Sequence, residues 1–235
     1  MVVLGAVALL ILFLLLVRPH RPKQKLLTVD APQKVLHPAY KVVAVPPIPK
    51  AESGAIAKWF VLDLQTTGLS TERGAEDLIV EASWLLLDAK YRLIRQRTLR
   101  VLQSYSGSLE AREVHGLSVE DLRNHSVTEA RFVEQLLADL HPGTTIVMHN
   151  AEFDKAILRG TVERVAPDAL SIVDSHPIFC TMTFLQSDHY PSLAILTSSV
   201  TPFTQAQFRS IRPISYRNAY FTRHCLIALS EIKPV

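Results

Sequence analysis

Two acidic side chains stand where apolar segments of the chain give way to polar turns. Asp63 lies near the end of the apolar run Trp59–Leu64 and is followed by Gln65, and Asp154 lies five residues after His149. Carboxylates gathered at strand ends are typical ligands of Mg²⁺ or Mn²⁺. Two such ions about 4 Å apart can cleave a phosphodiester bond. An amide is a neutral donor, so the Asp-x-Gln pair supplies less negative charge than such a site requires.

Two segments resemble the signatures of a known family. Phe60–Leu69 reads Phe-Val-Leu-Asp-Leu-Gln-Thr-Thr-Gly-Leu, and Val147–Asp154 reads Val-Met-His-Asn-Ala-Glu-Phe-Asp. They are similar to the first and second motifs of the DEDDh 3′–5′ exonucleases, which include the epsilon subunit of DNA polymerase III. Four further segments follow the family's order: Leu78–Ala82, Val114–Leu117, Phe179–Met182 and Tyr190–Leu193. The resemblance implies a ribonuclease H-like fold, Mg²⁺ or Mn²⁺ as cofactor, and Asp63 and Asp154 as metal ligands and catalytic residues.

The chain departs from the family at three positions. Gln65 stands where the family has Glu, and the best match to the third motif, Arg217–Arg223, places Arg217 at the His and Thr222 at the last Asp. No Asp or Glu occurs in His189–Ser230, so no shift of register supplies the missing acid. Arginine stays protonated and cannot serve as a general base, and loss of a base costs about 10²–10⁴ in rate. The resemblance therefore implies a degenerate member whose two carboxylates hold one weak ion or none.

Three functions are compatible with this pattern, and whether the chain is an enzyme stays open. The first is a membrane-anchored, catalytically impaired exonuclease-fold protein that binds the ends of single-stranded nucleic acid or a protein partner. The second is an active metal-dependent 3′–5′ exonuclease with unusual ligands, which the missing acid argues against. The third is a structural module without a ligand. For the first, the resemblance implies these nucleic-acid-binding residues: Thr66, Thr67, Gly68, His149, Asn150, Arg217 and Arg223.

The elements expected to position these residues follow from hydrophobic periodicity. Strands are predicted at Trp59–Leu64, Leu78–Leu87, Tyr91–Leu102 and Thr144–His149. Helices are predicted at Ser118–Leu140, with an interruption near His125, at Glu152–Val165 and at Asn218–Ile232. This order predicts an α/β fold, a mixed sheet flanked by helices. Ser118 and Asp121 are expected to form a capping box, Glu81 is expected to be structural, and His115 is expected to anchor a loop.

The N-terminal segment predicts a membrane anchor. Met1–Val17 is uncharged and apolar, and it is followed by Arg18, His20, Arg21, Lys23 and Lys25. Cationic residues favour the cytoplasmic side, so we expect a single-pass helix with its N-terminus outside and the domain in the cytoplasm. A buried N-terminal helix is the alternative. The predicted organisation is an anchor at residues 1–17, a Pro-rich linker at 18–57 and an exonuclease-like domain at 58–235.

Overall fold

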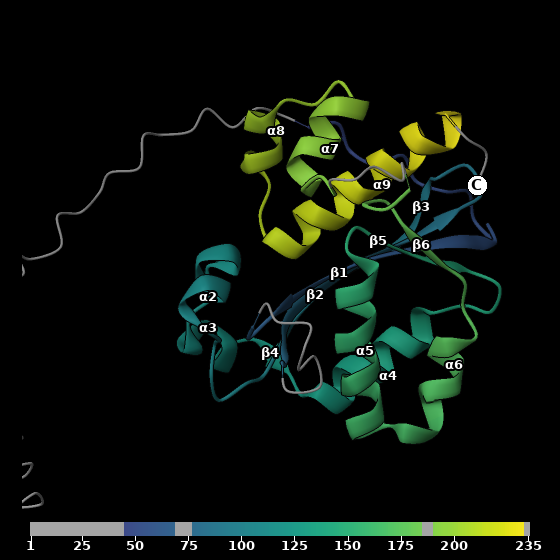
Figure 1. Cartoon of the computed structure of the whole chain (residues 1–235). Coiled ribbons are helices and arrows are strands. Elements are labelled where there is room, and N and C mark those ends of the chain that lie inside the picture. Colours follow the sequence, from purple (N-terminus) through teal and green to yellow (C-terminus); the bar gives the residue numbers. More distant parts are fainter. Residues whose placement is uncertain (1–44, 69–76, 185–189, 233–235) are drawn as a thin grey trace, which may run out of the picture. The chain divides into compact units, whose positions relative to one another are not determined.

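A six-stranded mixed sheet forms the centre of the protein (Figure 1). The computed structural model describes residues 45–68, 77–184 and 190–232. In these residues the strand order is β4-β3-β2-β1-β5-β6. The first three strands pair antiparallel, β5 and β6 run parallel to β1, and β4 runs parallel to β3. The bounds are β1 Ala57–Thr66, β2 Ile79–Asp88, β3 Leu93–Val101, β4 Ser126–Val127, β5 Thr145–Met148 and β6 Ile178–Cys180.

Helices cover both faces of the sheet. Figure 1 shows α4, α5 and α6 on one face and α7, α8 and α9 on the other, with α2 and α3 at one end of the sheet. The helices are α2 Leu109–His115, α3 Val119–Arg123, α4 Glu129–Asp139, α5 Ala151–Val165, α6 Leu170–Asp174, α7 Leu193–Val200, α8 Gln205–Ser210 and α9 Ile214–Ile232, with a 3₁₀ turn at Pro167–Ala169. The predicted mixed α/β sheet flanked by helices is thus confirmed.

The alternation of side chains along β1 decides where the acidic residue points, because successive residues of a strand face opposite sides of a sheet. The core under α4 and α5 receives Phe60, Leu62 and Leu64. The core under α7, α8 and α9 receives Trp59 and Val61. Asp63 and Gln65 continue the second series, so both side chains lie on the face that α9 covers.

The predicted interruption near His125 is confirmed, because Ser118–Leu140 forms the two helices α3 and α4 with the short strand β4 between them. His125 has a φ of 66°, in the left-handed region that a helix cannot accommodate. Thr128 then caps α4 by accepting a hydrogen bond from the backbone N–H of Arg131. The predicted capping box of Ser118 and Asp121 is present at the start of α3.

The last helix begins at Ile214, four residues before the predicted Asn218, and a buried acid explains its start. The carboxylate of Glu81 accepts hydrogen bonds from Ser215 Oγ at 2.7 Å and from Ser215 N at 3.3 Å. A carboxylate at a helix N-terminus satisfies free N–H groups and is favoured by the helix dipole. Glu81 therefore has the structural role expected of it.

Residues 45–56, which the sequence assigns to the linker, pack against the sheet and α9. Ile48 is buried, Tyr220 Oη donates a hydrogen bond to Pro46 O at 2.7 Å, and Lys50 forms a bridge with Leu93. Among the described residues, none of the helices has the length and apolarity needed to cross a membrane. The predicted anchor Met1–Val17 lies outside those residues.

Candidate functional site

A cavity of about 190 Å³ lies at the carboxyl ends of the parallel strands β1 and β5. Ligands of open α/β sheets usually bind at this edge. The structure brings together here Asp63, Leu64, Gln65, Thr66, Ala111, Val114, His115, His149, Asn150, Phe153, Asp154, Leu193 and Asn218. Six of the residues that the sequence singled out as candidates share this cavity: Asp63, Gln65, Thr66, His149, Asn150 and Asp154. We call it the end pocket.

Asp63 and Asp154 are the two carboxylates of the end pocket, and both are strongly desolvated. Their exposed fractions are 9% and 6%. Burial raises the pKa of Asp63 to about 7, although hydrogen bonds from Gln65 and Asn218 oppose the rise. Burial and then the neighbouring charge of Asp63 raise the pKa of Asp154 well above its usual value. Two close carboxylates resist ionising together, so the pair carries less than its full charge near neutral pH.

Amide groups converge on Asp63 where the resemblance implies charged ligands. Gln65 Nε2 donates a hydrogen bond to Asp63 Oδ2 at 2.6 Å. The side chain of Asn218 on α9 also donates to Asp63. Arg217 Nε donates to Asn218 Oδ1 at 3.0 Å, which leaves the Asn218 NH₂ group free to face the carboxylate. A continuous hydrogen-bond network thus links Arg217, Asn218, Asp63 and Gln65.

Asn218 is the functional residue that the sequence analysis did not select. A signal for it was present, because Ser215, Asn218 and Thr222 recur at helical spacing and place polar groups on one face of α9. Ser215 contacts Glu81 and Ser83 on the sheet. Asn218, one turn later on the same face, therefore reaches the end of β1.

Arg217 acts on the end pocket from outside it. Its guanidinium lies 4.6 Å from the centre of the Phe208 ring, a cation–π geometry. Burial lowers the pKa of Arg217 to about 10, so it stays cationic at neutral pH. It touches the pocket through Asn218 and lowers the pKa of Asp63 by its charge.

The structure does not bring Thr222 or Arg223 to the end pocket. Thr222 is only 1% exposed and does not line the cavity. Arg223 is 5% exposed, and its Nε donates to the carbonyl of Tyr91 at 2.9 Å. Arg223 thus joins α9 to the loop between β2 and β3.

His149 forms part of the pocket wall as a neutral side chain. Its Nε2 lies 3.1 Å from the carbonyl of Pro191, which can only accept, so Nε2 carries the proton. Nδ1 then accepts from Thr181 Oγ1 at 3.0 Å. Desolvation lowers the pKa of His149 to about 4, which excludes a cationic contact with phosphate near neutral pH. Asn150, next in the chain, is exposed and caps no backbone group of α5.

The turn after β1 is held by its own side chains. Thr66 Oγ1 donates to the carbonyl of Gly68 at 2.5 Å, and Thr67 Oγ1 accepts from Leu78 N at 2.9 Å. A Cβ at Gly107 would lie 2.6 Å from Thr67 O, so the backbones pack too closely for any other residue. Of the predicted residues Thr66, Thr67 and Gly68, only Thr66 lines the pocket.

The donor set of the end pocket does not fit a two-metal centre. Within the described ranges, no group of three or more His, Cys, Asp or Glu residues is placed to hold a metal ion. Glu81 lies opposite Gln65 in the sheet register, but its carboxylate is directed to Ser215. One oxygen of Asp63 is engaged by the Gln65 amide. The residues present favour a hydrogen-bonded, metal-free pocket.

Comparison with known proteins relates the fold to solved nucleases. No protein-family model and no curated protein matches the chain. Solved structures do match, including a zinc-bound complex of Escherichia coli exonuclease I with single-stranded DNA, at a TM-score of 0.61 and 17% identity over 74% of this chain and 40% of that one. Exonuclease I from Methylocaldum szegediense matches at a TM-score of 0.57 and 15% identity, over 75% of this chain and 41% of its own. The described residues thus have the exonuclease fold, and the chain spans about two fifths of these relatives.

Proposed function

We propose that this chain binds the ends of single-stranded nucleic acid in the end pocket without cleaving them. The observation that carries the proposal is the engagement of Asp63 by two amide donors in a pocket with only one other carboxylate. The likeness in fold to exonuclease I, solved with single-stranded DNA, supports nucleic acid as the ligand class.

The chemistry of the pocket argues against hydrolysis. Phosphodiester cleavage in this fold would need ions to offset the charge of the phosphate and a base to activate water. Arg217 is cationic and holds Asn218. His149 has both ring nitrogens occupied, so it has no free site for a water proton. His149 is therefore not free to act as the base, and Arg217 stays protonated.

The same pocket keeps groups that suit a nucleotide. Phe153 and Leu193 both line the pocket with apolar side chains, and aromatic side chains such as that of Phe153 stack on unpaired bases. The amides of Gln65, Asn150 and Asn218 offer donors and acceptors for base edges and sugar hydroxyls. These contacts depend on no metal ion.

Two measurements on the same protein test the proposal. Fluorescence anisotropy with labelled oligonucleotides should show binding that persists in EDTA, and gel analysis with Mg²⁺ or Mn²⁺ should show no shortening of the strand. Phe153→Ala should weaken binding about tenfold, since base stacking contributes about 1–3 kcal/mol. Metal-dependent 3′ trimming that disappears in Asp63→Ala would establish the active-exonuclease alternative. Absence of binding to DNA and RNA at low salt would favour a protein partner or a structural module.

We also propose that Met1–Val17 anchors the domain to a membrane, with the domain on the cytoplasmic side. The uncharged apolar run and the five cationic positions that follow it support this topology. Protease added outside intact cells should leave the C-terminal domain intact. Digestion from outside would contradict the proposed orientation.

A further inference from the structure

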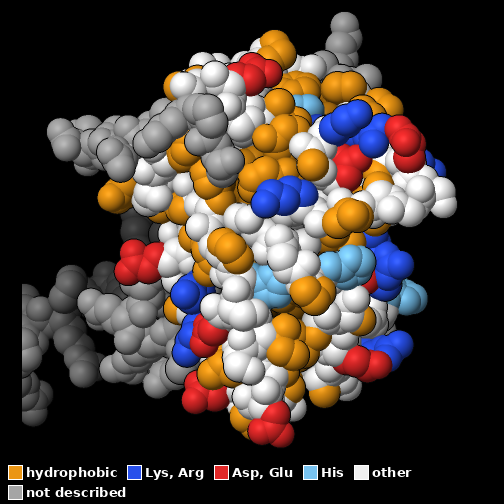
Figure 2. Space-filling view, turned by 90° about the vertical axis from the view of Figure 1, so that its right-hand side faces the viewer, with side chains coloured by type: hydrophobic (Ala, Val, Ile, Leu, Met, Phe, Trp, Pro, Cys, Tyr) orange, Lys and Arg blue, Asp and Glu red, His pale blue; other side chains and the backbone are white. Residues whose placement is uncertain are grey.

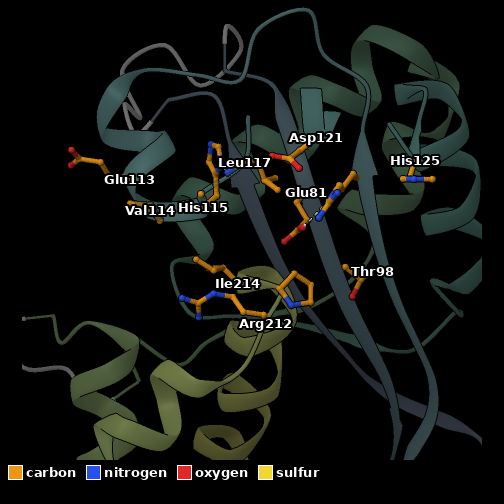
Figure 3. Close-up of a pocket in the computed structure, with 13 residues that line it drawn as sticks. Glu81, Thr98, Glu113, Val114, His115, Leu117, Asp121, His125, Arg212 and Ile214 are labelled. Atoms are coloured by element: carbon orange, nitrogen blue, oxygen red, sulfur yellow. Dashed lines mark hydrogen bonds and ion pairs between the residues drawn. The ribbon is translucent and has the colours of Figure 1, made fainter. Parts of the chain in front are cut away.

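A second cavity, of about 680 Å³, adjoins the end pocket. The two cavities share Val114 and His115 at the end of α2. Figure 3 shows residues of the α2–α3 region on one side of this cavity, Arg212 and Ile214 on the opposite side, and Glu81 between them. The shared residues place the second cavity next to the end pocket, and we call it the adjoining groove.

Two arginines line the groove, and a carboxylate pairs with one of them. Arg100 Nε forms an ion pair with Glu81 Oε2 at 3.7 Å, which is longer than a hydrogen bond. Arg212 is exposed and donates through one terminal nitrogen, Nη1, to the carbonyls of Arg209 and Ile211. Each guanidinium therefore has N–H groups beyond these contacts that a ligand in the groove can use.

Three acidic residues also line the groove, and two of them accept hydrogen bonds that fix the direction of their carboxylates. Glu81 accepts from Ser215, and Asp121 accepts from Ser118 N and Oγ in the capping box. Glu113 is exposed, and Figure 3 shows its carboxylate pointing away from Glu81 and Arg212. No Asp or Glu lies between His189 and Ser230, the stretch that supplies Arg212. A phosphate at Arg212 would displace no acidic partner, whereas one at Arg100 would share that guanidinium with Glu81.

We propose that a strand whose end occupies the end pocket continues through the adjoining groove, where Arg100 and Arg212 bind its backbone phosphates. This inference rests on the proposed function. It extends that function from binding of the strand end to binding of the nucleotides that follow it. Guanidinium groups bind phosphate oxygens through paired N–H donors. Phosphate contacts position a strand without reading its sequence, so the groove should accept DNA or RNA of any composition.

Chain length and salt dependence test this path. The slope of log affinity against log salt is about 0.7 per phosphate contact on single strands. A dodecanucleotide should therefore bind with a slope steeper by about 1.4 than a mononucleotide, which reaches only the end pocket. Arg212→Gln should reduce the dodecanucleotide slope by about 0.7, and Arg100→Gln by a similar amount. The mononucleotide should bind all variants equally.

Matched variants separate charge from folding. Arg212→Lys should retain the slope, since it keeps the charge, whereas Arg131→Gln should change nothing, because Arg131 is exposed on α4 and bound to Glu134. Arg212 is exposed, so Arg212→Gln remains informative if Arg100→Gln fails to fold. An unchanged slope in Arg212→Gln overturns the path but leaves end binding standing. Failure of the parent to bind either the mononucleotide or the dodecanucleotide refutes both proposals, and binding of an acidic peptide instead would point to a protein partner.

The charge distribution on the surface favours attraction of nucleic acid by the groove alone rather than by the whole protein. The face in Figure 2 intersperses acidic, basic and apolar side chains. The formal net charge of the whole chain is only +3. Variants outside the groove should therefore have little effect on the salt slope, which sharpens the test.

Discussion

Two buried aspartates lie on opposite faces of the same sheet, and their surroundings differ. Asp139, at the end of α4, is fully buried and accepts hydrogen bonds from Arg95 Nη1 at 2.6 Å, Arg97 Nε at 2.5 Å and Trp84 Nε1 at 3.1 Å. Burial acts to raise the pKa of Asp139, but the hydrogen bond from Arg97 and the charges of both arginines outweigh it and lower the pKa. Asp63 has amide donors and a second carboxylate instead, and its pKa is raised.

This difference separates an acid that joins two elements from an acid that lines the candidate site. Two cations offset the charge of Asp139, so its burial ties α4 to β3. Asp63 and Asp154 are buried together without a direct cationic partner, an arrangement that disfavours folding and is typical of functional sites. The two carboxylates of the end pocket therefore lack the charge compensation that Asp139 has, which leaves them available to a ligand.

The largest expected effect concerns the charge of Asp63. Its folded pKa is about 7 against an ordinary 3.8, so its contribution to stability is complete below 3.8 and is lost as pH rises through about 7. The difference of about 3 units corresponds to roughly 4 kcal/mol. Asp63→Asn should thus have a higher free energy of unfolding than the parent above neutral pH, by up to this amount.

Urea unfolding of both proteins across this pH window measures the effect. His149 and His224, whose pKa values burial lowers, titrate in both proteins and cancel in the difference. Asp168→Asn, on the exposed turn after α5, is the control and should follow the parent. A parent more stable than Asp63→Asn above neutral pH would mean that the network stabilises an ionised Asp63.

Asp139→Ala should have a lower free energy of unfolding than the parent at every pH above the lowered pKa of Asp139. Removal of the acid leaves Trp84 Nε1 without its buried acceptor and leaves Arg95 and Arg97 unpaired. Loss of one partner of a buried pair costs about 3 kcal/mol. Glu134→Ala, which breaks the exposed pair with Arg131, should cost less than about 1 kcal/mol. Equal losses in the two variants would contradict the structural role of Asp139.

The sequence predicted the half of the site that local motifs encode. Asp63 and Gln65 follow from the alternation of one strand, and Asp154 follows from a motif at the start of one helix. Asn218 could not be placed this way, because the position of α9 depends on the bond between Ser215 and Glu81, which are 134 residues apart. Arg223 was misleading for the same reason. It reads as a free cation until the fold supplies the Tyr91 carbonyl, 132 residues away.

The third expected effect is a gain of metal binding when the amides around Asp63 become acids. Gln65→Glu together with Asn218→Asp would surround the end pocket with four carboxylates, a hard oxygen set suited to Mn²⁺ or Mg²⁺. At 100-fold excess over the dissociation constant, binding should stabilise the variant by about 2.7 kcal/mol.

Thermal unfolding with and without Mn²⁺ compares this variant with the parent. We expect a rise in the melting temperature of the double variant and none in the parent. Asn124→Asp is the matched control, because that amide is exposed and does not line the pocket, so its change should not create a site. A parent stabilised by Mn²⁺ to the same extent would show that Asp63 and Asp154 hold a metal without help.

The smallest expected effect concerns Arg217, which acts on Asp63 from outside the end pocket. Its charge lowers the pKa of Asp63, and its Nε orients Asn218. Arg217→Met should therefore raise the pKa of Asp63 further and release the Asn218 amide, at a cost of about 1 kcal/mol for one hydrogen bond. Arg217→Lys keeps the charge but cannot reproduce the Nε contact together with the stacking on Phe208.

Titration of Asp63 by NMR separates the two contributions. A shift of its pKa in Arg217→Met but not in Arg217→Lys assigns the effect to charge, and equal shifts assign it to the oriented amide. No shift in either variant would remove Arg217 from the network and leave Asp63 governed by burial and Gln65 alone.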